Sequence, residues 1–174
     1  MKRLIPTLLC VLAILPLQAQ NNSFVMEPES PSVIGRISLI TPKIIAEFAP
    51  TAHFTLTTGF WLQANFWDLW EEGYADPTLV PSITIEPRYY FNLEDRKKKG
   101  KPTRYYSGWY ISLPFNIEFP DLRFNMGGTI GFQCIMGKRW YWNISFGPGF
   151  VYTDSRFHLD GAGDFGLGII LNKM

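Results

Sequence analysis

The sequence predicts an all-β fold, a single antiparallel up-and-down transmembrane β-barrel, and three observations lead to this prediction. Apolar and polar residues alternate with a period of two along most of the chain, which is the side-chain period of a β-strand. The apolar rows are dominated by large residues, whereas the opposite rows carry Gly, Ser, Thr, Asn and few charges. No stretch after residue 19 approaches 18 consecutive apolar residues, so the sequence offers no membrane-spanning helix there.

The composition narrows the classes of protein further. Of the 174 residues, 47% are hydrophobic and 16% aromatic, which excludes a disordered chain. The formal net charge of +1 provides no overall field that would attract nucleic acid. Two cysteines are too few for a disulfide framework or a cysteine zinc site, and we expect no cofactor and no metal.

The first residues have the layout of a secretory signal peptide. A short positive segment, Met1–Arg3, precedes the apolar run Leu4–Leu17, and Ala19 supplies a small residue at the expected cleavage site. We therefore expect a signal peptide over residues 1–19, a flexible lead-in over 20–32 and the barrel over 33–174.

Seven segments carry the alternation, and a spare candidate at 33–41 precedes them. The clearest is Trp140–Tyr152, where the even-numbered positions are apolar and the odd-numbered positions are mostly small or polar. Turns such as Pro120–Asp121 and Gly137–Lys138 separate the segments. In chain order, the predicted strands are 33–41, 43–48, 54–66, 82–92, 109–119, 124–136, 140–152 and 164–172.

The direction in which the bulky rows face decides between a soluble β protein and a membrane barrel. In a soluble sandwich or lipocalin the bulky row packs inward, but the remaining rows carry too little charge for a soluble surface. Many aromatic residues, such as Trp109, Phe119 and Trp140, lie near strand ends, as in a membrane interface belt. Because ~9–11 tilted residues span a bilayer and closure removes every sheet edge, we expect bulky residues against lipid and polar residues inside.

The number of strands depends on the first segment. Bacterial barrels of one chain have an even number of strands, and eight result if Val33–Thr41 is a strand that turns at Thr41–Pro42. The alternative is one long strand, Ile34–Phe48, with a bulge at Pro42 and another strand elsewhere. We favour eight strands.

An eight-stranded barrel is just wide enough for side chains to fill it. Isolated charges would be costly in this narrow interior, so we expect the inward-facing charges to pair and to close the lumen to solutes. A gated ion path through the same charges is the alternative. The predicted lumen charges are Arg36, Lys43, Glu47, Glu86, Arg88, Glu118 and Asp164.

Three segments carry a family resemblance: Glu86–Phe91, Gly108–Leu113 and the glycine-rich Asp164–Asn172. On these the chain resembles small OmpA/OmpX-type barrels, and especially uncharacterised outer-membrane barrel families of Gram-negative bacteria. The resemblance implies an outer-membrane location, no established activity, and contact with the barrel-insertion machinery during biogenesis. We expect a monomer among outer-membrane lipid. Such barrels usually end on an aromatic residue, whereas this chain ends on Met174.

One basic cluster stands out between the fourth and fifth predicted strands, within residues 93–107. Its simplest interpretation is a solvated loop tip, and its functional interpretation is a contact to anionic phosphates such as those of lipopolysaccharide. The sequence leaves open which side of the membrane it faces. Its members are Arg96, Lys97, Lys98, Lys99, Lys101 and Arg104. A second unusual stretch, Trp67–Tyr74, mixes aromatic and acidic residues and fits an interface belt or an exposed binding loop.

No catalytic set can be assembled. The segment His158–Gly163 is similar to the histidine-containing strand of outer-membrane lipid A deacylases, but Asp160 stands where their serine nucleophile is needed. We interpret it as a turn rich in Gly and Asp. His53 is expected at the interface, and Cys134 in a lipid-facing row. We expect a non-catalytic barrel that serves envelope structure, adhesion or partner docking; the alternatives are a lipid A-modifying hydrolase and a small channel.

Overall fold

The computed structural model describes residues 32–64, 79–119, 122–153 and 156–172. The predicted signal peptide and the stretch 67–74 lie outside these ranges. The strands are β1 (Val33–Ser38), β2 (Lys43–Phe48), β3 (Phe54–Ala64), β4 (Leu79–Tyr90), β5 (Gly108–Ser112), β6 (Phe115–Glu118), β7 (Arg123–Gly127), β8 (Thr129–Met136), β9 (Trp140–Thr153) and β10 (Arg156–Ile170). Between β4 and β5 lie a short helix, α3 (Leu93–Lys98), and a 3₁₀ turn, η1 (Arg104–Tyr106).

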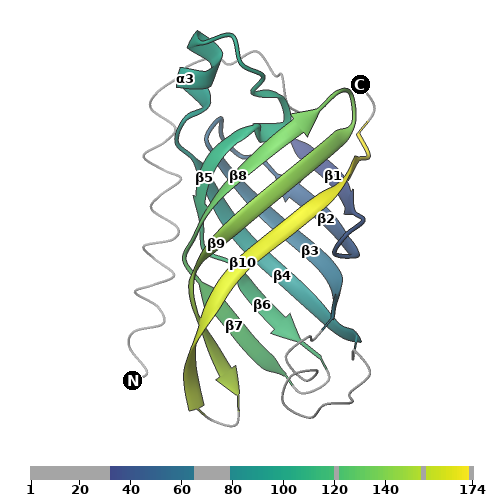
Figure 1. Ribbon diagram of the computed structural model, residues 1–174, viewed down its shortest axis with the longest axis vertical. Coiled ribbons are helices and arrows are strands. Elements are labelled where there is room, and N and C mark those ends of the chain that lie inside the picture. The colour runs from purple at the N-terminus through teal and green to yellow at the C-terminus, as the bar shows by residue number, and fades with distance from the viewer. Residues whose placement is uncertain (1–31, 65–78, 120–121, 154–155, 173–174) are drawn as a thin grey trace.

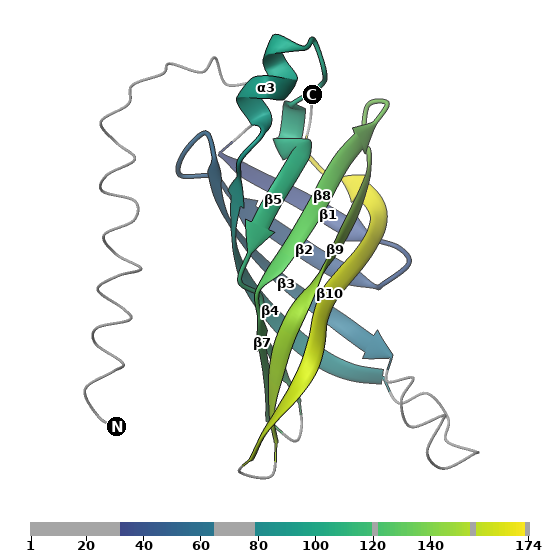
Figure 2. The same ribbon diagram turned by 60° about the vertical axis from the view of Figure 1, so that its left-hand side comes forward.

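These strands form one closed antiparallel barrel (Figures 1 and 2). Both β5 and β6 pair with β4, so together they act as one interrupted strand. In the same way, β7 and β8 both pair with β9. The last strand, β10, pairs with β9 on one side and with β1 on the other, which closes the sheet. The predicted eight-stranded up-and-down β-barrel is therefore confirmed.

The two interruptions fall within the predicted strands 109–119 and 124–136. The alternation had indicated that each of these strands is continuous. Pro114 has no N–H to donate to a neighbouring strand, and its carbonyl accepts from Gly127 N at 3.1 Å. Gly128 N donates to the carbonyl of Pro148 at 3.0 Å. A Cβ on Gly147 would lie 2.0 Å from Gly128 O, so the chains approach too closely here for any larger residue.

One prediction about strand limits is wrong, and one alternative is excluded. β1 and β2 are separate strands, paired from Val33↔Phe48 to Ser38↔Lys43, as the favoured division into eight strands predicts, so the alternative of a single long strand over 34–48 does not form. The predicted turn at 158–163 is part of β10, whose pairing with β9 begins at Arg156↔Thr153. The small residues of this segment resembled a turn, but the register with β9 continues through them and holds them extended.

The two ends of the barrel differ. The α3 end carries α3, η1, the turns 49–53 and 137–139, and the neighbouring ends of β1 and β10 (Figure 1). The opposite end, which we call the far end, carries the turn 39–42 between β1 and β2. The basic cluster therefore lies at the same end as the first and last paired residues of the barrel.

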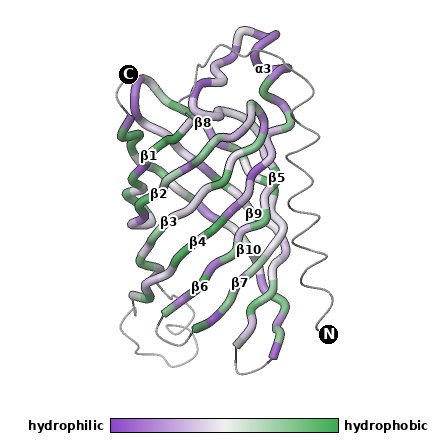
Figure 3. Tube along the Cα trace, turned by 180° about the vertical axis from the view of Figure 1, so that it is seen from behind, coloured by the Kyte–Doolittle hydropathy of each residue, from purple (hydrophilic) through white to green (hydrophobic). Residues whose placement is uncertain are grey.

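The barrel is apolar outside and polar inside. Figure 3 shows hydrophobic and hydrophilic residues alternating along the strands. Outward side chains such as Ile44 and Phe146 are 62% and 64% exposed, whereas the inward Arg36 and Glu47 are 1% and 0% exposed. Most charged and polar residues that are buried lie on inward rows, which is the reverse of a soluble protein's core.

Candidate functional site: a charged lumen

The structure places the seven predicted lumen charges on inward positions of the barrel wall. Six are less than a tenth exposed, and Asp164 is half-buried. They come from five strands and form four ion pairs with one another or with Arg123. They are contributed by β1 (Arg36), β2 (Lys43, Glu47), β4 (Glu86, Arg88), β6 (Glu118) and β10 (Asp164).

The part of the lumen near the α3 end holds a network around Arg36 and Glu47, which form an ion pair. Glu47 also accepts hydrogen bonds from the hydroxyls of Thr55 at 2.7 Å and Tyr90 at 3.3 Å. Arg36 Nη1 donates to Gln133 Oε1 at 3.0 Å. Charge-assisted hydrogen bonds of this kind offset the cost of burying both charges.

A second pair joins this network. Arg88 Nη2 lies 2.6 Å from Glu86 Oε2, and Arg88 Nη1 donates to the same Gln133 oxygen at 3.2 Å. The Arg88 guanidinium also lies over the Tyr110 ring, 4.6 Å from its centroid. Tyr110 in turn donates to Asn143 Oδ1 at 2.6 Å. The network thus extends across the barrel from β1 to β9 and leaves little unpaired charge.

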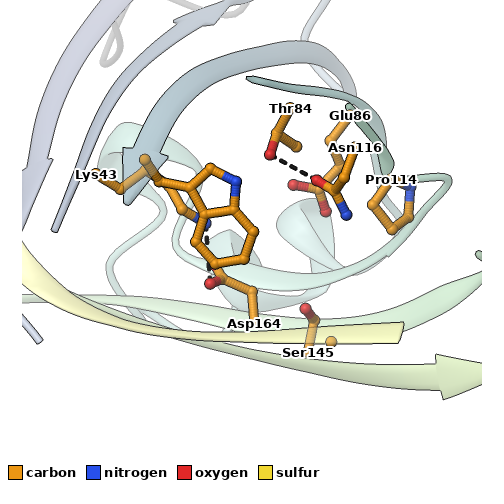
Figure 4. Close-up of a pocket in the computed structure, with 9 residues that line it drawn as sticks. Lys43, Thr84, Glu86, Pro114, Asn116, Ser145 and Asp164 are labelled. Atoms are coloured by element: carbon orange, nitrogen blue, oxygen red, sulfur yellow. Dashed lines mark hydrogen bonds and ion pairs between the residues drawn. The ribbon is translucent and has the colours of Figure 1, made fainter. Parts of the chain in front are cut away.

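A third pair lies closer to the far end. Lys43 Nζ is 2.9 Å from Asp164 Oδ1 and 4.3 Å from the centroid of the Trp61 ring. These residues line a small cavity of about 30 Å³ in the lumen. Figure 4 shows Lys43 and Asp164 facing Thr84 and Asn116 across it.

The fourth pair is weaker. Glu118 is 5% exposed and accepts a short hydrogen bond from Asn125 Nδ2. Its other oxygen lies 3.8 Å from Arg123 Nε, and the Arg123 side chain is 39% exposed. Because Arg123 is partly solvated, this pair contributes less stability than the buried pairs.

The α3 end of the lumen holds residues of the connection between β4 and β5. Tyr105 and Tyr106 of η1 are 2% and 7% exposed and pack with Tyr90 and Ile34 in the barrel mouth. The carbonyl of Tyr105 accepts from Arg36 Nη2 at 3.3 Å and from Gln133 Nε2 at 2.8 Å. We call Tyr105 and Tyr106 the tyrosine plug. It joins the lumen network to a segment outside the strands.

Burial raises the pKa of the Tyr106 hydroxyl to about 12, and the negative charge of Glu47 contributes to the same shift. The hydroxyl donates to the carbonyl of Thr51 at 3.2 Å. Tyr106 therefore stays neutral and hydrogen-bonded at physiological pH.

The fold divides the basic cluster into two hydrogen-bonded arginines and four exposed lysines. The connection contains a short helix, α3, followed by η1, and Leu93 and the tyrosine plug anchor it in the barrel mouth. Arg96 donates to the carbonyl of Pro102, and Arg104 donates to the Tyr105 hydroxyl. The exposed members are the four lysines, Lys97, Lys98, Lys99 and Lys101.

The remaining candidates lie apart from the lumen network. His158 and Asp160 are exposed on β10, where Asp160 Oδ1 accepts from Gly161 N. His53 Nδ1 lies 3.0 Å from the carbonyl of Tyr90, and its Nε2 lies 3.5 Å from Glu94. Cys134 is a half-buried free cysteine on β8. Among the described residues, no group of three His, Cys, Asp or Glu side chains could hold a metal ion.

Sequence reasoning missed Gln133 and the tyrosines as parts of the site. The available signal was position: Tyr110, Tyr141 and Gln133 all occupy the polar rows of their strands and are 0–2% exposed. A bulky tyrosine on a row of small polar residues indicates lumen filling. Nothing local to η1 predicted that Tyr105 and Tyr106 would enter the barrel.

In the part of the chain that the structure describes, no helix is long and apolar enough to cross a membrane. No family model, curated protein or solved structure matches this chain, so the fold and the lumen geometry carry the argument about function.

Proposed function

We propose that this chain is a monomeric, non-catalytic barrel of the bacterial outer membrane, exported by its signal peptide. Its lumen is closed to solutes, and its surfaces serve envelope structure, adhesion or partner docking. The observation that carries the proposal is the inverted polarity of the barrel. Bulky apolar side chains such as Phe146 and Ile44 are exposed around an interior of ion pairs, which is the arrangement of small transmembrane barrels of the OmpA/OmpX type.

Closure of the lumen is supported by the tyrosine plug and the network beneath it. Arg36, Glu47 and Gln133 fill the section next to the plug, and each is at most 1% exposed. A solute would have to break charge-assisted hydrogen bonds in a poorly hydrated space to pass. We therefore expect no steady conductance of porin size in planar bilayers.

The membrane location is tested by fractionation and gel mobility. The full-length protein is expected in the outer-membrane fraction after carbonate washing, with faster migration in unheated than in boiled samples because a closed barrel resists detergent. Recovery in the soluble fraction as a folded protein without detergent would refute the proposal. Lipid A mass spectra from cells with and without the protein should be identical, whereas a lost acyl chain would overturn the non-enzyme assignment.

The four exposed lysines of the basic cluster are proposed to contact anionic phosphates of membrane lipid, including lipopolysaccharide. Their charges are free of ion pairs within the described residues, so they can gain charge-assisted contacts. Replacing all four by Gln should leave the gel shift intact and weaken salt-sensitive binding to vesicles that contain lipopolysaccharide. A matched variant, Lys138→Gln, changes an exposed lysine in another turn at the same end and controls for loss of charge alone.

A further inference from the structure

β10 has a backbone edge that no described strand covers. β1 has six residues and β10 has fifteen, and only Arg36–Ser38 and Gly168–Ile170 pair with each other. Beyond these pairs, Leu39 N donates to Leu167 O at 2.8 Å. In Figure 1 the lower part of β10 has only β9 beside it. We call the uncovered edge of β10, residues 156–164, the seam.

Odd-numbered residues of β10 direct their backbone groups toward the open side. The carbonyls of Leu167 and Phe165 accept from the β1–β2 hairpin, whereas the N–H of the even-numbered Ile170 donates in the opposite direction, to Arg139 O. Within the seam, the N–H and C=O groups that continue this odd series belong to Phe157, Leu159, Gly161 and Gly163. An edge of this kind is a template for another strand.

One side chain occupies a donor of this edge. The Gly161 N–H donates to Oδ1 of the preceding residue, Asp160, at 2.7 Å, and both residues are exposed. A strand that paired with the seam would need this N–H for one of its own carbonyls. The Asp160 carboxylate competes with such a strand, because its charge-assisted bond forms within one chain and costs no entropy of association.

The outward side chains of the seam favour association. Leu159 and Phe157 are 78% and 71% exposed, the highest values among the large hydrophobic residues that the structure describes. A Cβ on Gly161 would meet nothing within 4 Å, so the space over this residue is open. A bulky side chain from a neighbouring strand can therefore lie there.

The seam is complementary to a second copy of itself. In an antiparallel pair centred on Leu159, odd-numbered residues meet odd-numbered residues, and Phe157 lies opposite Gly161 of the second copy. On the inward row, His158 lies opposite Asp160 of the second copy, which places a ring N–H donor beside a carboxylate. Within residues 156–162, no like charges face each other in this register.

We propose that the seam is a pairing edge for a second copy of this chain, and that Asp160 keeps it unpaired by occupying the Gly161 N–H. The inference does not depend on the membrane location. An antiparallel pair turns one barrel upside down relative to the other, so barrels inserted the same way up in one membrane cannot form it. At the proposed membrane location, Asp160 therefore acts on the exported chain before insertion.

Sedimentation of the full-length protein in excess detergent tests the role of Asp160. Asp160→Ala removes the acceptor and should lower the concentration at which half of the barrels pair by at least ~10-fold, because the Gly161 N–H of each copy becomes free. Asp160→Asn is the matched control, since its amide oxygen still accepts, and it should pair no more readily than the unchanged protein.

A proline tests the role of the N–H itself. Gly161→Pro, added to Asp160→Ala, removes the donor on the open side and should restore the monomer. Proline is tolerated at this place in a strand because the N–H that it lacks faces away from the neighbouring strand.

Cross-linking tests the register. In an Asp160→Ala chain with Cys10→Ser and Cys134→Ser, Leu159→Cys should give dimers with a short bismaleimide. Phe146→Cys, which is exposed on β9 away from the seam, should not.

Asp160→Ala that pairs no more readily than the unchanged protein would refute the proposal, as would Asp160→Asn that pairs as strongly as Asp160→Ala. Dimers that cross-link through Phe146→Cys and not through Leu159→Cys would show that the seam is not the pairing edge. If the proline variant does not fold, as judged by β-sheet circular dichroism, the single variants and the cross-links still decide the question. A protein that is soluble without detergent refutes the membrane assignment alone, and the same comparison is then made in buffer.

Discussion

Arg36 and Arg88 donate to one shared acceptor, Gln133 Oε1, at 3.0 and 3.2 Å, although they lie on β1 and β4. Glu47 and Glu86 neutralise one guanidinium each. The same Gln133 amide donates to the carbonyl of Tyr105. One neutral side chain therefore holds two cations in place and fixes the tyrosine plug.

Gln133→Leu should destabilise the barrel by about 3 kcal/mol, because it leaves two buried guanidinium groups short of an acceptor. Gln133→Glu should cost less, since a carboxylate still accepts from both arginines although it cannot donate to Tyr105. Urea unfolding in detergent micelles, followed by the loss of the fast-migrating gel band, measures both. Equal losses for the two variants would show that the shared acceptor matters little.

Phe146→Arg tests which way the bulky rows face. The side chain of Phe146 is 64% exposed near the middle of β9. In a bilayer, an arginine on the lipid face near the midplane costs ~2–4 kcal/mol. In water, a substitution at an exposed site changes stability by roughly 0.5 kcal/mol or less. Folding into lipid vesicles against urea measures the difference, and Phe146→Leu is the matched control.

Gly168→Ala should weaken the closure between β1 and β10. A Cβ on Gly168 would lie 1.9 Å from the backbone oxygen of Ile37, which cannot move without breaking the pairing. Overpacking of this kind costs ~1–3 kcal/mol. Gly161→Ala on the same strand meets nothing within 4 Å and should be nearly neutral. Limited proteolysis and the gel shift compare the two; a neutral Gly168→Ala would contradict the close approach.

The raised pKa of the Tyr106 hydroxyl predicts that the barrel loses stability in strong alkali. Its pKa is raised to about 12 in the folded state, against ~10 in an unfolded chain. A raised pKa means that the folded state holds the proton more tightly, so the contribution is complete below pH ~10 and is lost as pH approaches 12. The decrease is on the order of 2 kcal/mol. From pH 8 to pH 11.5, the midpoint of urea unfolding should fall less for Tyr106→Phe than for the unchanged protein. Equal falls would contradict the raised pKa of Tyr106.

The strands and their facing were accessible from the sequence because both are local properties. Residues such as Lys43, Glu47 and Arg88 occupy alternate positions among apolar neighbours, and a period of two assigns each to a face without knowledge of the partner strand. The ion-pair partner of each charge was less accessible from the sequence. That Lys43 meets Asp164 depends on closure of the whole barrel.

The missed features depend on distant parts of the chain. The connection between β4 and β5 enters the barrel mouth because Gln133 and Arg36 bind the carbonyl of Tyr105, and its tyrosines adopt φ values of 50° and 60° that no local pattern suggests. The extension of β10 through 156–163 was hidden because its glycines resembled a turn. Only the register with β9 holds that segment extended.

The positions of the paired charges along the chain have a consequence for biogenesis. Arg36 and Glu47 lie on one hairpin, Glu86 and Arg88 on one strand, and Glu118 and Arg123 on one hairpin. At the proposed membrane location, each of these three pairs can form before the neighbouring strands arrive, which lowers the cost of carrying those six charges into hydrocarbon. Of the four lumen pairs, Lys43 with Asp164 alone must wait for the last strand, so its formation marks the completion of assembly.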